Sequence, residues 1–193
     1  MYKLLFLVWR EKMKTKDITK IAIMISIIIV LGFFPPIPIS LLPVPIVIQN
    51  AGFMLAGLLL GKKNGTIATL LFLLLVAIGF PILAGGRGGM TVFFSITAGY
   101  LYAYPFATFL IGWLSEKFNP NNQNTAYAFG ITFLFGALFI DFCGAVGVSI
   151  LSDVSLSKSL IASLAFIPGD TIKAFLTAVI AKRISKSLGK RRE

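Results

Sequence analysis

The chain has 193 residues, 57% of them hydrophobic, and its mean hydropathy of +0.90 lies well above that of soluble domains. It has no histidine and a single cysteine, Cys143, which excludes imidazole-based metal sites, histidine catalytic dyads and a disulfide within the chain. The net charge of +11 comes from basic residues that flank apolar runs, a pattern that favours a membrane over nucleic acid as the partner.

Six apolar runs recur along the chain, each close to the roughly 20 residues that a helix needs to cross a bilayer. The second and third runs are short and meet at a tight turn, residues 61–65. We therefore expect an all-α integral membrane protein, a bundle of six transmembrane helices. The runs cover residues 18–34, 46–61, 64–80, 91–114, 125–151 and 160–182.

The basic residues predict the orientation of the bundle. With the N-terminus inside the cell, six spans return the C-terminus inside, and only Arg87, Lys158 and Lys173 of the 18 basic residues fall outside. This arrangement follows the positive-inside rule, so both termini are expected to be cytoplasmic, facing anionic lipid. The expected parts are a basic extension (1–17), the transmembrane domain (18–183) and a basic tail (184–193), with no separate soluble domain.

The first run carries Ala22 and Ser26, small residues four positions apart that allow another helix to approach closely. This face either packs inside the bundle or docks a separate membrane subunit. The following segment, residues 35–45, holds five prolines and no charge. It is expected to form an extended external loop that lies on the bundle and could act as a lid.

Two amide side chains, Gln49 and Asn50, open the second run at its outer end. Amides offer donors and acceptors together, so they suit a polar ligand or, alternatively, hydrogen bonds between helices. After the third run comes Gly85-Gly86-Arg87-Gly88-Gly89, which matches neither a dinucleotide fingerprint nor a Walker P-loop. Its glycines predict exposed backbone N–H groups, and Arg87 can bind a carboxylate bidentately. The alternative is a flexible turn with a solvated charge.

Two polar side chains interrupt the next runs. Tyr100 lies about ten residues into the fourth run, where it either reaches a cavity or packs in the bundle. Asp141 lies inside the fifth run, where a carboxylate costs about 2.5–3.5 kcal/mol on insertion scales. It is therefore paired, protonated or beside water, with Lys173 and Arg87 as candidate partners, and we favour a paired structural or pocket-edge role.

The last run contains Pro168-Gly169, which predicts a helix break with Asp170 as the cap of the new N-terminus. Asp170 and Lys173 are three residues apart and share a helix face, so they form either an intrahelical ion pair or a polar site at membrane depth. The predicted topology brings this motif, the two amides and the glycine-rich loop to the outer end of the bundle. Such convergence indicates a pocket for a polar small molecule.

Several of these segments, in this order and spacing, resemble the BioY family, the biotin-specific substrate-binding (S) components of energy-coupling factor (ECF) transporters. The resemblance runs from about residue 18 to 183. It implies a multi-pass protein of the prokaryotic plasma membrane, not an enzyme, that captures biotin with high affinity from outside. The matching segments are Pro43–Asn50, Ala56–Gly61, Gly79–Gly89, Gly99–Leu101 and Pro168–Ala174.

The resemblance also implies partners. Uptake in this family involves a transmembrane coupling protein and two cytoplasmic ATPases, and the chain itself contains no Walker A motif with which to use ATP. The face of Ala22 and Ser26 is the candidate docking surface. We expect no catalytic residue, metal or resident cofactor, since biotin is the transported ligand.

Biotin itself suits the predicted site residues. We expect Asp170 to accept a ureido N–H, Lys173 and Asn50 to complete that end, and Arg87 with the Gly85–Gly89 backbone to hold the carboxylate. Gln49, Tyr100 and Asp141 complete the list of expected ligand-binding residues. Three alternatives remain: an S component for another vitamin, a lipid-headgroup enzyme, which the lack of histidine disfavours, and a structural scaffold without a ligand.

Overall fold

A computed structural model describes residues 14–38 and 44–189 of the chain. These residues are helical and contain no β-strand; isolated backbone bridges join Ile37 to Ile46 and Leu83 to Arg87. The outer parts of the predicted terminal extensions (1–13 and 190–193) and the middle of the predicted proline-rich loop (39–43) lie outside the described residues.

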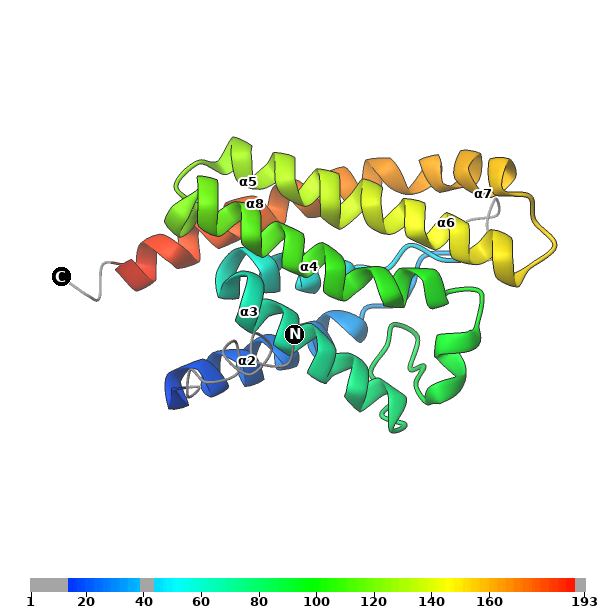
Figure 1. The fold of residues 1–193 in the computed structure, drawn as a ribbon, viewed down its shortest axis with the longest axis horizontal. Coiled ribbons are helices and arrows are strands. Elements are labelled where there is room, and N and C mark those ends of the chain that lie inside the picture. The colour runs from blue at the N-terminus through cyan, green and yellow to red at the C-terminus, as the bar shows by residue number, and fades with distance from the viewer. Residues whose placement is uncertain (1–13, 39–43, 190–193) are drawn as a thin grey trace, which may run out of the picture.

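The described helices run roughly along one axis of an elongated bundle (Figure 1). In chain order, the α-helices are α2 (Thr15–Gly32), α3 (Asn50–Ala77), α4 (Ala98–Phe118), α5 (Thr125–Ile131), α6 (Ile140–Leu151), α7 (Leu156–Ser163) and α8 (Ile167–Gly189). The shorter helical segments are η1 (Met90–Phe94), η2 (Pro120–Asn122), the π-helical η3 (Thr132–Phe139) and η4 (Leu164–Phe166). Segment η3 continues α5 into α6, and η4 continues α7 into α8.

Three continuous helical stretches of the described chain are long and apolar enough to cross a membrane: Asn50–Ala77, Thr125–Leu151 and Leu156–Ser187. The bundle surface is apolar as well, since Phe33, Phe94 and Ile150 expose 76%, 72% and 75% of their surface. Exposed aromatic and aliphatic side chains on this scale are unfavourable in water and favourable against acyl chains. The fold is that of a helical membrane protein.

Helix α3 changes direction at Gly61, whose backbone is left-handed (φ +74°) while the rest of α3 stays helical. Figure 1 shows its two halves folding back on each other. Gly65 permits this, because a Cβ there would lie 2.6 Å from the Ala56 carbonyl oxygen. The backbone N–H of Lys62 donates to the Glu116 carboxylate of α4 at 2.9 Å. The predicted turn over 61–65 thus forms on one glycine.

Small residues also bring α4 against α6. A Cβ on Gly147 would lie 2.8 Å from the Gly99 Cα, so the two helices cross nearly in backbone contact at these glycines. Deeper in the core, the ring of Phe53 in α3 stacks on Tyr104 of α4 with centroids 4.1 Å apart. These contacts fix the start of α4, and therefore Tyr100, against the other helices.

The predicted helix break at Pro168-Gly169 is wrong in position. The α-helical geometry is interrupted earlier, at η4, and α8 has already begun at Ile167. Proline is tolerated in the first turn of a helix, where its missing N–H leaves no intrahelical bond unmade. Asp170 consequently lies within the first turn of α8 and not at its N-cap.

Basic side chains collect at one end of the bundle. The N-terminal end of α2 and the C-terminal end of α8 lie at the same end in Figure 1. Their exposed basic residues are Lys14, Lys16, Lys20, Lys182, Arg183 and Lys186.

Candidate ligand-binding site

A pocket opens where the first turns of α3, α4 and α8 meet the loop after α3 and one face of α6. The N-termini of α3 and α4 therefore lie beside it, and their partial positive charge favours an anionic or acceptor-rich ligand. Its inner cavity is narrow, about 50 Å³ for water-sized molecules. The lining residues are Val44, Pro45, Ile46, Val47, Gln49, Asn50, Leu83, Ala84, Arg87, Thr97, Tyr100, Leu101, Tyr104, Ile140, Asp141, Phe166, Asp170 and Lys173.

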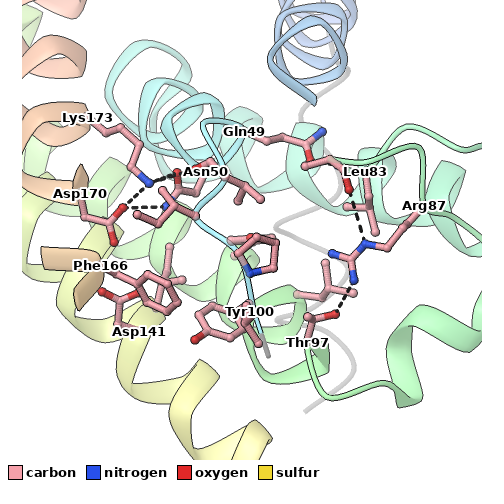
Figure 2. Close-up of a pocket in the computed structure, with 18 residues that line it drawn as sticks. Gln49, Asn50, Leu83, Arg87, Thr97, Tyr100, Asp141, Phe166, Asp170 and Lys173 are labelled. Carbon is pink, nitrogen blue, oxygen red and sulfur yellow. Dashed lines mark hydrogen bonds and ion pairs between the residues drawn. The ribbon is translucent and has the colours of Figure 1, made fainter. Parts of the chain in front are cut away.

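One side of the pocket carries a buried polar network (Figure 2). Lys173 forms an ion pair with Asp170 one turn earlier on α8, and its ammonium also donates to Asn50 Oδ1 at 3.0 Å and to the Val47 carbonyl at 2.9 Å. Asn50 Nδ2 donates to Asp170 Oδ1 at 3.4 Å. Asp170 is 2% exposed. The network joins α3 to α8 and holds a carboxylate in place inside the membrane domain.

The opposite side of the pocket carries Arg87, whose side chain points toward the cavity in Figure 2. Its Nε donates to the Ala84 carbonyl at 3.4 Å and its Nη1 to Thr97 Oγ1 at 3.3 Å. Arg87 is exposed, and among the described residues it forms no ion pair with a carboxylate. A guanidinium in this position can bind an anionic group at the mouth of the pocket.

The four glycines beside Arg87 do not line the pocket, whose loop contribution comes from Leu83, Ala84 and Arg87. The N–H of Gly86 donates to the Leu83 carbonyl and that of Gly89 to the Val76 carbonyl, at 2.9 and 2.8 Å. Gly85, Gly86 and Gly89 have positive φ, and Gly88 lies against the Phe80 carbonyl. In this structure the glycines shape the loop that presents Arg87.

Gln49 lines the pocket, yet its side chain is occupied by the protein. Its Nε2 donates to the carbonyls of Ile28 and Ile82, at 3.1 and 2.8 Å, and its Oε1 accepts from the Ala84 N–H at 3.0 Å. The residue is 3% exposed. Gln49 therefore connects α2, α3 and the loop after α3. This agrees with the alternative prediction for the amide pair, which was hydrogen bonding between helices.

Tyr100 and Asp141 form a third part of the wall. Both are nearly buried, 8% and 7% exposed, and the Tyr100 hydroxyl and Asp141 Oδ2 have no hydrogen-bond partner in the described structure. The Tyr100 ring packs edge-on against Phe166, with centroids 6.4 Å apart. It fits over Gly144 of α6, where any Cβ would overlap the ring. The Asp141 carboxyl lies beside that of Asp170.

Most of the predicted polar residues therefore converge, namely Gln49, Asn50, Arg87, Tyr100, Asp141, Asp170 and Lys173. Asp141 forms no ion pair with Lys173 or Arg87 in the described chain, although both were candidate partners. Sequence reasoning missed Thr97, Tyr104 and Phe166. Tyr104 follows Tyr100 by four residues, one helical turn, and this spacing was the available signal.

The fold and the pocket define a class of protein: a helical membrane protein with a buried site for a small polar ligand. A sequence profile described as the BioY family matches residues 9–190. The chain belongs to the BioY family.

Relatives named biotin transporter BioY match most of the chain. The protein from Lactococcus lactis is 48% identical over 177 residues, 91% of this chain and 94% of the relative. The protein from Rhizobium etli is 40% identical and covers 89% and 94%. A solved structure, the S-component for biotin from an ECF-type ABC transporter, matches with a TM-score of 0.87 and 47% identity, over 91% of this chain and 95% of that chain. The family is one of transporter S components, so the chain is not an enzyme.

Proposed function

We propose that the chain is the high-affinity biotin-binding S component of an ATP-driven ECF transporter. The observation that carries this proposal is the buried Asn50–Asp170–Lys173 network, which faces a pocket in a BioY-family membrane domain. A carboxylate held inside a membrane domain is costly, and a ligand that supplies N–H donors offsets part of that cost.

The two sides of the pocket suit the two ends of biotin. The ureido ring carries N–H groups that Asp170 accepts, with Lys173 and Asn50 completing this end. The valerate carboxylate then reaches Arg87 on the opposite side, the exposed cation that Ala84 and Thr97 orient. The orientation follows from burial, because the neutral ring enters the buried side and the charged carboxylate stays near solvent.

The small volume of the inner cavity requires the pocket to widen when biotin binds. About 50 Å³ accommodates a few water molecules, since a single water needs at least roughly 10–15 Å³ by this measure. Biotin, with about sixteen non-hydrogen atoms, is larger than this cavity. The residues that line the cavity therefore move apart when biotin binds, a degree of adjustment common among binding proteins.

Because the proposed uptake is driven by ATP, we infer that the partners of the chain are a transmembrane coupling protein and two cytoplasmic ATPases. Ala22 and Ser26 are both exposed on α2, and the Ser26 hydroxyl donates to the Ala22 carbonyl at 3.0 Å. The Ser26 hydroxyl therefore already has an acceptor. Ala22 and Ser26 together form a face of small, uncharged side chains, which suits close packing of a partner helix. The opposite face of α2, with Ile21, Met24 and Ile28, is buried in the bundle.

For topology, we propose six spans with both termini in the cytoplasm of a prokaryotic cell and the pocket open to the outside. The basic ends of α2 and α8 then lie against the anionic inner leaflet. The two halves of α3, divided at Gly61, count as two of the six spans.

Ligand-induced thermal stabilisation of the detergent-purified protein tests the proposal. Biotin at 100 times its dissociation constant is expected to stabilise the fold by about 2.7 kcal/mol, whereas other vitamins at the same concentration leave the melting temperature unchanged. Stabilisation by a different vitamin alone would assign the pocket to that ligand, and stabilisation by none would favour a structural subunit.

A further inference from the structure

An apolar groove runs along the exposed surface between α4 and the second half of α3, residues 62–77. The two helices meet at one end of the groove, where a Cβ on Gly112 would lie 2.4 Å from the Lys62 nitrogen, and they run side by side toward the loop that carries η1 (Figure 1). The groove has a volume of about 840 Å³. Of its described lining residues, only Leu101 also borders the ligand pocket, so the groove is a separate feature.

The groove offers an occupant very little polar surface. Among the described residues that line it, Thr66 and Tyr102 carry the polar side chains. The Thr66 hydroxyl donates to the Lys62 carbonyl at 2.6 Å and the Tyr102 hydroxyl to the Phe93 carbonyl at 3.0 Å, so both donors are already used. An exposed apolar concavity of this size suits a hydrocarbon chain. Its apolar side chains with more than half of their surface exposed include Leu70, Leu74, Phe94 and Phe106.

Both walls of the groove lead to a lysine at the same end. On α3, Lys63 precedes Thr66 by three residues and therefore lies on the face that lines the groove. On α4, Phe109 lines the groove, and Trp113 and Lys117 follow it at intervals of four residues on the same face. The two helices are antiparallel, so both lysines lie at the end where α3 and α4 meet.

This end has the composition of a membrane interface. The Lys117 ammonium lies over the Trp113 ring, 5.5 Å from its centroid, and Trp113 is 40% exposed. Tryptophan and lysine are typical of the level of the lipid headgroups. Lys62 pairs with Glu116 at 3.6 Å, so Lys62, Lys63 and Lys117 together with this one carboxylate leave two net positive charges. Such a charge favours an anionic headgroup over a zwitterionic one.

We propose that this groove binds one anionic phospholipid, with an acyl chain between α3 and α4 and the phosphate beside Lys63 and Lys117. The length of the groove agrees with a single leaflet. It extends along α3 from Thr66 to Ala77, a rise of about 16 Å at about 1.5 Å per residue. Half of a hydrocarbon core is about 15 Å thick. In the proposed topology the lysine end is cytoplasmic, so the lipid belongs to the inner leaflet.

A second apolar groove provides a contrast within the same chain. It lies between α4 and α6 and has a volume of about 680 Å³. Its α6 wall belongs to the helical stretch Thr125–Leu151, whose sequence holds no lysine or arginine. This groove is therefore expected to accept acyl chains without selecting a headgroup, whereas the groove between α3 and α4 selects an anionic one.

The test measures lipid binding to the detergent-purified protein by native mass spectrometry. The probes are phosphatidylglycerol, phosphatidylcholine with the same acyl chains, and glycerol 3-phosphate as a phosphate without chains. Phosphatidylglycerol is expected to bind at least about tenfold more tightly than phosphatidylcholine. The double variant Lys63→Gln/Lys117→Gln should weaken phosphatidylglycerol binding by roughly 10- to 30-fold and abolish the preference, since each lysine near an anionic lipid contributes to its binding.

Two further variants separate the headgroup from the chain. Ala77→Phe places a bulky ring in the groove, so it should weaken binding of the first phosphatidylglycerol molecule several-fold while leaving both lysines in place. The matched controls are Lys182→Gln/Lys186→Gln, which removes the same charge from the exposed end of α8, and Ala126→Phe on the exposed face of α5. Both controls should retain the wild-type affinity and preference. Thermal melting shows that each variant is folded, and should Ala77→Phe not fold, the lysine variant decides the question.

Four results would overturn the inference. The first is equal affinity of the wild-type protein for the two lipids. The second is a preference that survives in Lys63→Gln/Lys117→Gln, or that falls equally in Lys182→Gln/Lys186→Gln. The third is a folded Ala77→Phe protein with unchanged phosphatidylglycerol binding, which would place the chain elsewhere. The fourth is binding of glycerol 3-phosphate as tight as that of phosphatidylglycerol, which would indicate a site for free phosphate.

Discussion

Replacing Asp170 by alanine is expected to abolish tight biotin binding while leaving the protein folded. Asp170 is 2% exposed and pairs with Lys173, so its removal leaves both the ligand N–H and the ammonium short of an acceptor. Removing one partner of a buried charged hydrogen bond costs about 2–5 kcal/mol, and each 1.4 kcal/mol is about tenfold in affinity. The dissociation constant should therefore rise by roughly 30-fold to several thousand-fold.

The structure also explains why the fold should survive. Lys173 loses its carboxylate partner but keeps hydrogen bonds to the Val47 carbonyl and Asn50 Oδ1, so two of its three N–H donors stay satisfied. Asp170→Asn keeps an acceptor oxygen and should lose less affinity than Asp170→Ala. The assay is equilibrium binding of labelled biotin to detergent-purified protein, with thermal melting as the test of folding. Asp153→Ala, which removes an exposed carboxylate from the α6–α7 connection, is the control. A folded Asp170→Ala protein that binds biotin within about threefold of wild type would refute this reasoning.

Three further predictions address docking, topology and folding. Ala22→Leu fills an exposed small-residue face of α2, so it should reduce ATP-dependent uptake but spare biotin binding; equal loss of both would place this face inside the bundle. In a Cys143→Ser background, Lys63→Cys should not react with a membrane-impermeant thiol reagent added to intact cells, because position 63 is expected to be cytoplasmic. Strong labelling would show the opposite topology. Glu116→Ala removes the acceptor of the Lys62 N–H and should lower the melting temperature by about 2–4 °C without changing biotin affinity, whereas an unchanged melting temperature would show that this contact adds no stability.

Sequence patterns predicted the parts of the fold that depend on hydrophobicity and on backbone freedom. The helical membrane class and the BioY family are confirmed, and the turn near Gly61 follows from a residue that tolerates positive φ. The count of six spans stays a prediction. The helix start at Ile167 was missed because proline signals a break from sequence alone but is equally at home in a first helical turn.

The candidate site was predictable to the level of which polar residues meet, and not to the level of what each one binds. Gln49 and Asn50 are adjacent in sequence, yet the Gln49 side chain hydrogen-bonds only backbone groups, whereas Asn50 joins the Asp170–Lys173 network. Likewise, the N–H groups of Gly86 and Gly89 were expected to face a ligand and instead close the loop. Competition among hydrogen-bond partners depends on tertiary positions, which residue identity does not reveal.

The affinity of the purified protein for biotin decides whether this chain is a high-affinity biotin-binding S component. A nanomolar complex requires about −12 kcal/mol, and for about sixteen non-hydrogen atoms this is roughly 0.8 kcal/mol per atom, within the ceiling for small ligands. We expect a nanomolar dissociation constant for biotin in detergent, without any partner subunit, and far weaker binding of other vitamins. Millimolar binding of biotin, or tighter binding of another vitamin, would contradict it.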